Sequence, residues 1–362
     1  MIAQVSGLTL IFFLGFYFFL GNPYDTARGI QRTWAWSKEG KLGMFPDPRT
    51  SFEPEKKLNG YKTKSSYIRI PEGTETPIDD SNRIEYPTTA KGFLAYKKIG
   101  SAVELFSEAG ELLWTKEYKS YPRIHPDGNI ILFLSGDNNQ VLISDINGNS
   151  MGIKKMDGRF LTDLAFSPKS FSKGESAVLF SGGEIFLLDG KGDLLFSKTI
   201  GDKDPVFAKS LAISSNGDRI AVHFLKGNRD YIRVFDHGGG EKEEWNLGKV
   251  FPHKINLAVS PEGEVLAGFP DALILYSKNG KILFEKKRTK MNSVYQTVFH
   301  SGTWFAGEAE GILYFLNEKG VSLREERIPS SEKPFRFFST GTIGAAFMEG
   351  TKEIVLFQEQ LR

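Results

Sequence analysis

The chain has 362 residues, no cysteine and a formal net charge of +2 at pH 7. This near-neutral balance, without aromatic-rich basic repeats, argues against DNA or RNA as a partner. The lack of cysteine excludes disulfides and a lipid-modified cysteine anchor. It does not discriminate between an oxidising and a reducing compartment.

Residues 5–21 are the most apolar stretch near the N-terminus. They read VSGLTLIFFLGFYFFLG and carry no charge, which matches the short end of the length that crosses a bilayer. A cleaved signal peptide is the alternative, but residues 1–4 contain no basic residue and Phe19-Leu20-Gly21 is a poor cleavage site. We therefore expect a short tail at 1–4 followed by one uncleaved transmembrane helix at 5–21.

Residues 22–64 are expected to form a juxtamembrane segment and linker. Asn22 and Pro23 are typical of a helix start, so a short helix could run to about Glu39. Cationic and aromatic side chains within it suggest contact with lipid headgroups, and the candidates are Arg28, Arg32, Trp34 and Trp36. A flexible tether whose aromatic residues pack on the next domain is the alternative. The Pro-, Lys- and Glu-rich part from 45 to 64 suits an extended spacer.

Further along the chain, a sequence motif of two apolar runs on either side of a glycine turn recurs about every 40 residues. Examples are VELFSEAGELLW (103–114), IFLLDGKGDLLF (185–196) and LILYSKNGKILF (273–284). A second motif, one per period, predicts an inner strand hairpin, as in LAISSNGDRIAVHF (211–224) and LAVSPEGEVLAGF (257–269). Strand-forming repeats of this length are typical of β-propeller blades.

The number of these motifs predicts an all-β, seven-bladed β-propeller over residues 65–358. The transmembrane helix precedes this propeller, and a short tail at 359–362 follows it. The seventh copy lacks an outer strand. The strand-like run at 65–70 precedes the first copy, so we expect it to close the last blade and remove the open edges.

These motifs resemble the bacterial WD-repeat-like and quinoprotein-like β-propellers. LAVSPEGEVLAGF is similar to their inner hairpin, and SKNGKILFEK is similar to the blade turn of quinoprotein-like repeats. The resemblance covers roughly residues 65–358 and implies a fold, but not a function, because propellers host many activities.

Two features of the sequence point to opposite sides of the membrane for the propeller. Arg28, Arg32, Lys38 and Lys41 follow the apolar segment, and the positive-inside rule alone favours a cytoplasmic propeller. The resemblance implies the opposite, because membrane-tethered propellers of this type are mostly extracytoplasmic. We expect a single-pass protein of the bacterial inner membrane with a periplasmic propeller, and a cytoplasmic orientation is the alternative.

No catalytic, cofactor or metal motif is apparent. There is no nucleophile elbow, phosphate-binding loop or zinc-binding spacing. His125 and His300 occupy a turn position that is serine in other repeats, so a turn hydrogen bond is expected. Asp145, Asp189 and Asp236 end the third strand of their repeats, where a carboxylate accepts turn N–H groups. No catalytic residue, metal or cofactor is therefore assigned.

One group of cationic residues is a candidate binding site. The loops that enter the inner strands carry cations, and in a propeller such loops gather around one mouth of the central channel. This candidate rim, which could hold an acidic segment or an anionic ligand, comprises Arg83, Arg123, Lys209, Lys254, Arg288, Lys290 and Arg336.

The sequence thus predicts a membrane-tethered, non-enzymatic propeller that serves as a scaffold or protein-docking subunit of a bacterial envelope complex. A small-molecule or glycan-binding sensor or enzyme that uses the channel mouth is the alternative.

Overall fold

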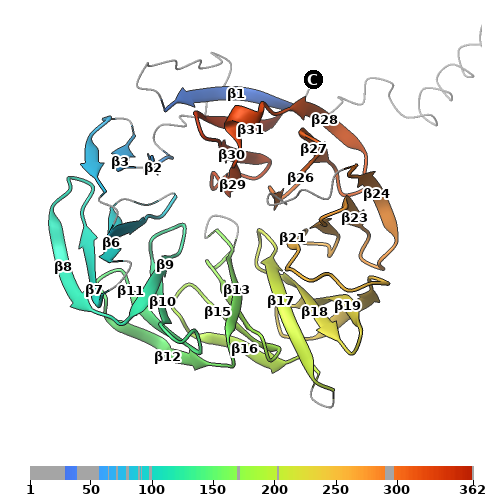
Figure 1. Cartoon of the computed structure of the whole chain (residues 1–362), viewed down its shortest axis with the longest axis horizontal. Coiled ribbons are helices and arrows are strands. Elements are labelled where there is room, and N and C mark those ends of the chain that lie inside the picture. The colour runs from blue at the N-terminus through green and yellow to red at the C-terminus, as the bar shows by residue number, and fades with distance from the viewer. Residues whose placement is uncertain are drawn as a thin grey trace, which may run out of the picture.

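The structure, a computed structural model, describes residues 29–38, 57–63, 65–70, 72–78, 81–88, 90, 92–97, 100–168, 172–201, 204–289 and 297–360. The strands in these ranges form eight antiparallel sheets around one axis, seven with four strands and one with three (Figure 1). The expected all-β propeller is confirmed. The expected number of seven blades is wrong, because the ring has eight.

The first four blades are numbered in chain order. Their strands are β2 (Gly60–Lys62), β3 (Ser66–Arg69) and β4 (Glu75–Pro77) in blade 1; β5 (Asn82–Glu85), β6 (Phe93–Lys97), β7 (Ala102–Phe106) and β8 (Leu112–Glu117) in blade 2; β9 (Ser120–Ile124), β10 (Ile130–Ser135), β11 (Gln140–Asp145) and β12 (Ser150–Asp157) in blade 3; and β13 (Leu161–Phe166), β14 (Ser176–Phe180), β15 (Glu184–Leu188) and β16 (Leu194–Thr199) in blade 4.

The last four blades continue around the ring. Their strands are β17 (Val206–Ile213), β18 (Arg219–Lys226), β19 (Arg229–Asp236) and β20 (Glu241–Asn246) in blade 5; β21 (Asn256–Val259), β22 (Val265–Gly268), β23 (Ala272–Tyr276) and β24 (Ile282–Lys287) in blade 6; β25 (Val298–His300), β26 (Phe305–Ala309), β27 (Ile312–Leu316) and β28 (Ser322–Arg327) in blade 7; and β29 (Arg336–Ser339), β30 (Ala345–Glu349), β31 (Glu353–Gln360) and β1 (Gly29–Ser37) in blade 8, with a short 3₁₀ helix η2 (Ser330–Glu332) before β29.

The glycine turns that mark each repeat connect the third and fourth strands of a blade. In blade 5, the Asp236 carboxylate accepts the N–H groups of Gly238 at 3.1 Å and Gly240 at 2.7 Å. Gly239 between them has φ of +77°, a left-handed conformation that glycine adopts without steric cost. Asp145 and Asp189 accept turn N–H groups in the same way. The structural role predicted for these aspartates is confirmed.

The hydrophobic core lies between neighbouring blades. Between blades 4 and 5, for example, Leu187 of β15 and Phe196 of β16 pack with Val222 and Phe224 of β18. Both faces of a blade are therefore apolar, and each blade depends on its two neighbours to remove these faces from water.

The ring is closed by β1, not by residues 65–70. β1 pairs antiparallel with β31 from Gly29 opposite Gln360 to Ser37 opposite Glu353 and becomes the outer strand of blade 8 (Figure 1). Blade 8 is thus built from both ends of the described chain. Ser66–Arg69 is instead the middle strand of blade 1, between β2 and β4. These two assignments correct the prediction that residues 65–70 close the last blade. The strand β2 corrects a second prediction, because it lies within residues 45–64, where the sequence predicts an extended spacer.

The tryptophans expected at a membrane interface are part of this closure. Trp34 and Trp36 are 2% and 8% exposed and pack with Tyr61 and Phe347 between blades 8 and 1. Arg32 forms an ion pair with Glu353 at 2.6 Å. The expected short helix is therefore wrong, and the burial of Trp34 and Trp36 in the core contradicts their headgroup contact. The headgroup contact of Arg32, whose side chain is 38% exposed, stays a prediction. Arg28 lies outside the described residues.

The expected transmembrane segment at 5–21 also lies outside the described residues. Within the part of the chain that the structure describes, no helix has the length and apolar character needed to cross a bilayer.

Candidate functional site

The seven predicted rim cations divide into distinct groups. The side chains of Lys209 and Arg288 are buried in ion pairs, with Asp230 inside blade 5 and with Glu308 between blades 6 and 7, so neither is exposed at a channel mouth. Lys254 is exposed and lies 3.3 Å from Asp163. Lys290 is outside the described residues. The remaining three, Arg83, Arg123 and Arg336, lie on the inner strands β5, β9 and β29 of blades 2, 3 and 8.

A hollow of about 800 Å³ lies where blades 8, 1 and 2 meet. It is lined by the inner strands of these blades and by the end of the closing strand, with Lys38, Lys62, Glu85, Tyr86, Arg336 and Glu349 as its polar side chains of interest. Its volume is within the range of about 300–1,000 Å³ that is usual for ligand sites.

Arg336 is the best-positioned cation of the hollow. Its guanidinium lies 2.7 Å from the Glu349 carboxylate and donates a hydrogen bond of 2.8 Å to the Tyr86 hydroxyl. It also lies over the rings of Tyr86 and Phe338. Its side chain remains 56% exposed, so the guanidinium is fixed by blades 2 and 8 and still open to a ligand.

Glu349 is fully engaged by two cations. Its second partner is Lys38, whose ammonium donates to Oε1 at 2.6 Å. Burial alone would raise the pKa of the Glu349 carboxyl, but the charges of Arg336 and Lys38 outweigh burial and hold this pKa below its ordinary value. Glu349 is therefore ionised, and its charge is used within the protein.

Glu85 is the second carboxylate of the hollow. It accepts a hydrogen bond of 2.7 Å from Arg123 of the next blade. Burial raises the pKa of Glu85, and the charges of Arg123 and Arg336 oppose this effect without cancelling it. Arg123 and Glu85 thus form a link between blades 3 and 2 at the edge of the hollow.

Lys62 was missed by sequence reasoning because it lies in a three-residue strand within the expected spacer. Burial lowers the pKa of its ammonium, and the charges of Arg83 and Arg336 lower it further while Glu85 opposes them. Lys62 is therefore close enough to these groups to interact with them. Lys38, Lys62 and Arg336 line the hollow, and Arg83 and Arg123 lie on the neighbouring inner strands β5 and β9. We call these five residues the cationic cluster. The described lining of the hollow itself contains two carboxylates, Glu85 and Glu349.

A separate charged network lies inside blade 5. Lys209 donates to both carboxylate oxygens of Asp230, at 2.7 and 2.8 Å, and to the carbonyl oxygen of Phe251 at 2.7 Å. Asp230 also accepts the Phe251 N–H at 2.7 Å, and His223 Nε2 lies 3.1 Å from it. All these side chains are buried, so the network holds strands β17, β18 and β19 together and offers no ligand site.

The turn histidines have the structural role that their repeat position predicts. His125 Nδ1 accepts the Asp127 N–H at 3.2 Å, and His300 Nδ1 accepts the Gly302 N–H at 3.3 Å. Burial lowers the pKa of both rings, that of His300 to about 3. In blade 8 the buried turn residue is Thr340. Across the described ranges, no group of three or more acidic or histidine side chains is arranged to hold a metal ion.

The fold defines the protein class as an eight-bladed β-propeller. In a comparison with solved structures, the chain is similar to BamB from Moraxella catarrhalis, with a TM-score of 0.54 and 11% sequence identity over 91% of this chain and 99% of that one. At this identity the likeness establishes the fold alone. No family model matches the sequence, and a search of curated proteins finds no match. The β-propeller fold that the resemblance implies is confirmed.

Proposed function

We propose that the protein is a membrane-tethered, non-enzymatic propeller that docks a protein partner in a bacterial envelope assembly. The observation that carries this proposal is the cationic cluster at the meeting of blades 8, 1 and 2, because its positive charge exceeds what its two carboxylates neutralise. The rigid closed ring supports it, since a preformed surface binds a partner without an ordering cost.

Affinity purification of the full chain from detergent-solubilised membranes tests the docking role. We expect a partner protein to co-purify with the wild-type chain and to remain bound after washing with moderate salt. An Asp157→Asn variant serves as a control, because its exposed pair with Lys155 is on the outer strand of blade 3. Recovery of the propeller without any partner would contradict the proposal.

The membrane tether is the second part of the proposal. Residues 22–28 separate the apolar segment at 5–21 from the start of β1 at Gly29. Seven residues span at most about 25 Å when fully extended. If segment 5–21 crosses the bilayer, the outer edge of blade 8 is therefore held next to the membrane, and docking takes place at that surface.

We further propose that the propeller lies on the periplasmic side of a bacterial inner membrane. A pair of C-terminal fusions tests this orientation. We expect an alkaline-phosphatase fusion to be active and a fusion to an ordinary fluorescent protein to be dark. The reverse pair of results would place the propeller in the cytoplasm, which the cations after the apolar segment favour.

The hollow also supports the alternative function, a small-molecule or glycan-binding sensor or enzyme at the channel mouth. Its volume and its fixed guanidinium at Arg336 are the features that favour a small ligand. Small-molecule turnover that is lost in an Arg336→Ala variant would support this alternative over docking.

A further inference from the structure

We infer that the hollow between blades 8, 1 and 2 binds an acidic peptide segment of the partner protein, with Lys62 in its wall and Arg83 beside it on β5 as the main charged contacts. This inference rests on the proposed docking function and names the chemistry of the docked segment. It depends on how the charges of the cluster are divided between partners inside the protein and partners outside it.

Three of the five cations of the cluster have carboxylate partners. Lys38 and Arg336 share Glu349, at 2.6 and 2.7 Å, and Arg123 pairs with Glu85 at 2.7 Å. Both carboxylates are therefore already engaged.

The other two cations have no carboxylate partner within the described residues. Lys62 lines the hollow and has no ion pair there, and the one side-chain hydrogen bond of Arg83 is to the carbonyl oxygen of its neighbour Asn82. Each is only partly accessible to water, and burial followed by the charge of Arg83 lowers the pKa of Lys62. Placing like charges together without a counter-charge is unfavourable, so a ligand that supplies negative charge would relieve this cost.

The lining of the hollow favours a peptide over a compact inorganic anion. Besides the cations, Ile84, Pro334 and Phe335 contribute to its wall, and Thr63 and Thr351 contribute polar groups. A peptide can present carboxylates to the cations and carbon atoms to the apolar wall at once. The cations also come from different blades, which suits charges distributed along an extended chain.

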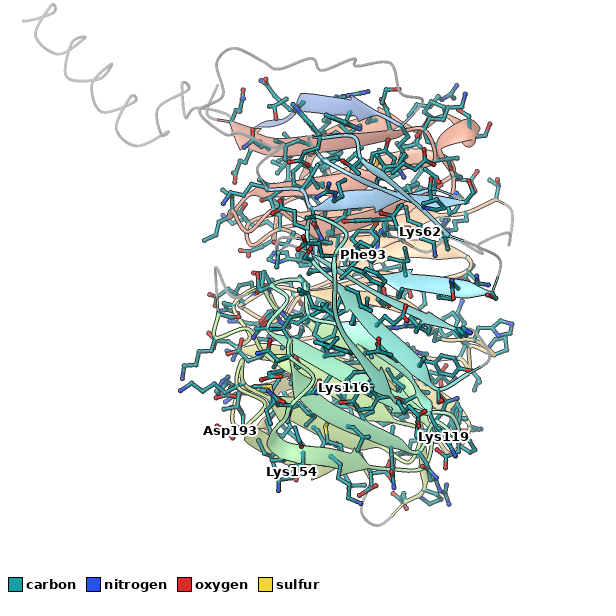
Figure 2. All side chains as sticks on the ribbon, turned by 90° about the vertical axis from the view of Figure 1, so that its left-hand side faces the viewer. Lys62, Phe93, Lys116, Lys119, Lys154 and Asp193 are labelled. Carbon is teal, nitrogen blue, oxygen red and sulfur yellow. The ribbon has the colours of Figure 1, made fainter. Side chains whose placement is uncertain are left out.

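Loops that lead into the inner strands lie at one face of the ring, and Figure 2 labels Lys62 of the hollow toward that face. Figure 2 views the ring edge-on, with Lys119 of such a loop at the right-hand face and Asp193, at the turn between β15 and β16, at the left-hand face. Like Asp193, Lys191 and Lys278 lie in turns between the third and fourth strands of a blade, in blades 4 and 6 respectively. They are exposed and provide a matched charge-removal control on the opposite face.

The test compares the full-length wild-type chain with a Lys62→Gln/Arg83→Gln variant and with a Lys191→Gln/Lys278→Gln variant. Glutamine removes the charge and keeps a long polar side chain, and thermal unfolding checks that each variant is folded. The probe is a fluorescein-labelled peptide of ten glutamates, with a ten-glutamine peptide as its neutral counterpart. Binding is measured by fluorescence anisotropy at low and at physiological salt.

We expect the glutamate peptide to bind the wild-type chain and the opposite-face variant equally, and to bind the Lys62→Gln/Arg83→Gln variant about tenfold more weakly. Binding should weaken as salt rises, because exposed charges are screened. Equal affinity for all three proteins, or no binding to the wild type, would overturn the inference. Full displacement of the peptide by an equimolar amount of inorganic phosphate would also overturn it, because the site would then be one for a small anion.

Co-purification from membranes separates this inference from the proposed function. If the partner is retained equally by the wild type and the Lys62→Gln/Arg83→Gln variant, docking stands and the acidic-peptide site is wrong. If no partner is recovered with the wild type, docking itself is wrong, whatever the peptide binds.

Discussion

Deletion of residues 1–38 is expected to leave a protein that aggregates or fails to fold, because it removes β1 from blade 8. The deletion exposes the edge of β31 and uncovers the apolar surface on which Trp34 and Trp36 pack. Two buried tryptophans alone account for about 300–500 Å². At about 25 cal/mol per Å², this is an upper estimate of roughly 8–12 kcal/mol, comparable with the whole stability of a typical domain.

Deletion of residues 1–28 is the matched control, because it removes the apolar segment and keeps every residue of β1. This shorter deletion should give a soluble monomer with a sharp thermal transition in circular dichroism. A monomeric product with the same melting temperature from both deletions would show that the ring closes without β1. The result also discriminates between β1 and residues 65–70, since the longer deletion retains Ser66–Arg69.

Replacement of Asp230 by asparagine should lower the free energy of unfolding by about 3–5 kcal/mol. The change leaves the buried ammonium of Lys209 without a counter-charge, and breaking one partner of a buried ion pair costs about this much. Three strands of blade 5 meet at the Asp230 carboxylate, so loss of its charge should also weaken the packing of the core between blades 5 and 6. Urea unfolding at pH 7, followed by tryptophan fluorescence, measures the change.

The control is Asp271→Asn, which removes the partner of Lys249 at a surface where both side chains are about a third or more exposed. Surface ion pairs contribute at most about 1 kcal/mol, so the urea midpoint should move little. If Asp230→Asn shifts the midpoint no more than Asp271→Asn does, the buried network is not a major source of stability.

The fold was predictable wherever a blade keeps its glycine turn. The turns at Gly192 and Gly239 have the positive φ that only glycine adopts easily, and this requirement repeats along the chain. Blade 1 also has a positive-φ glycine, Gly73, in the turn between β3 and β4, but β2 and β4 have only three residues each, so no apolar run flanks this turn at the length seen in the other repeats. The strand β1 was read as interfacial because tryptophan beside arginine is also typical of a membrane surface. Only tertiary pairing with β31 distinguishes the two cases.

The candidate site was predictable in part. The position of Arg83, Arg123 and Arg336 on inner strands follows from the repeat pattern. The structure places Arg336 in the wall of the hollow, and Arg123 pairs with Glu85 of that wall. Lys209 and Arg288 occupy similar positions in sequence, yet each folds back to a carboxylate about 20 residues further along, Asp230 or Glu308. Sequence spacing does not reveal such pairing, because it depends on which neighbouring strand carries the acid.

The native mass of the particle extracted from membranes tests the docking account most directly. The full chain, solubilised in mild detergent, is separated by size exclusion and its protein mass is determined by light scattering with correction for detergent. We expect a complex in which the 40.5-kDa chain is joined by a second protein, and partial loss of that protein when Lys62 and Arg83 are both replaced by glutamine. A particle that contains only the 40.5-kDa chain, with the wild type and the variant alike, would contradict it.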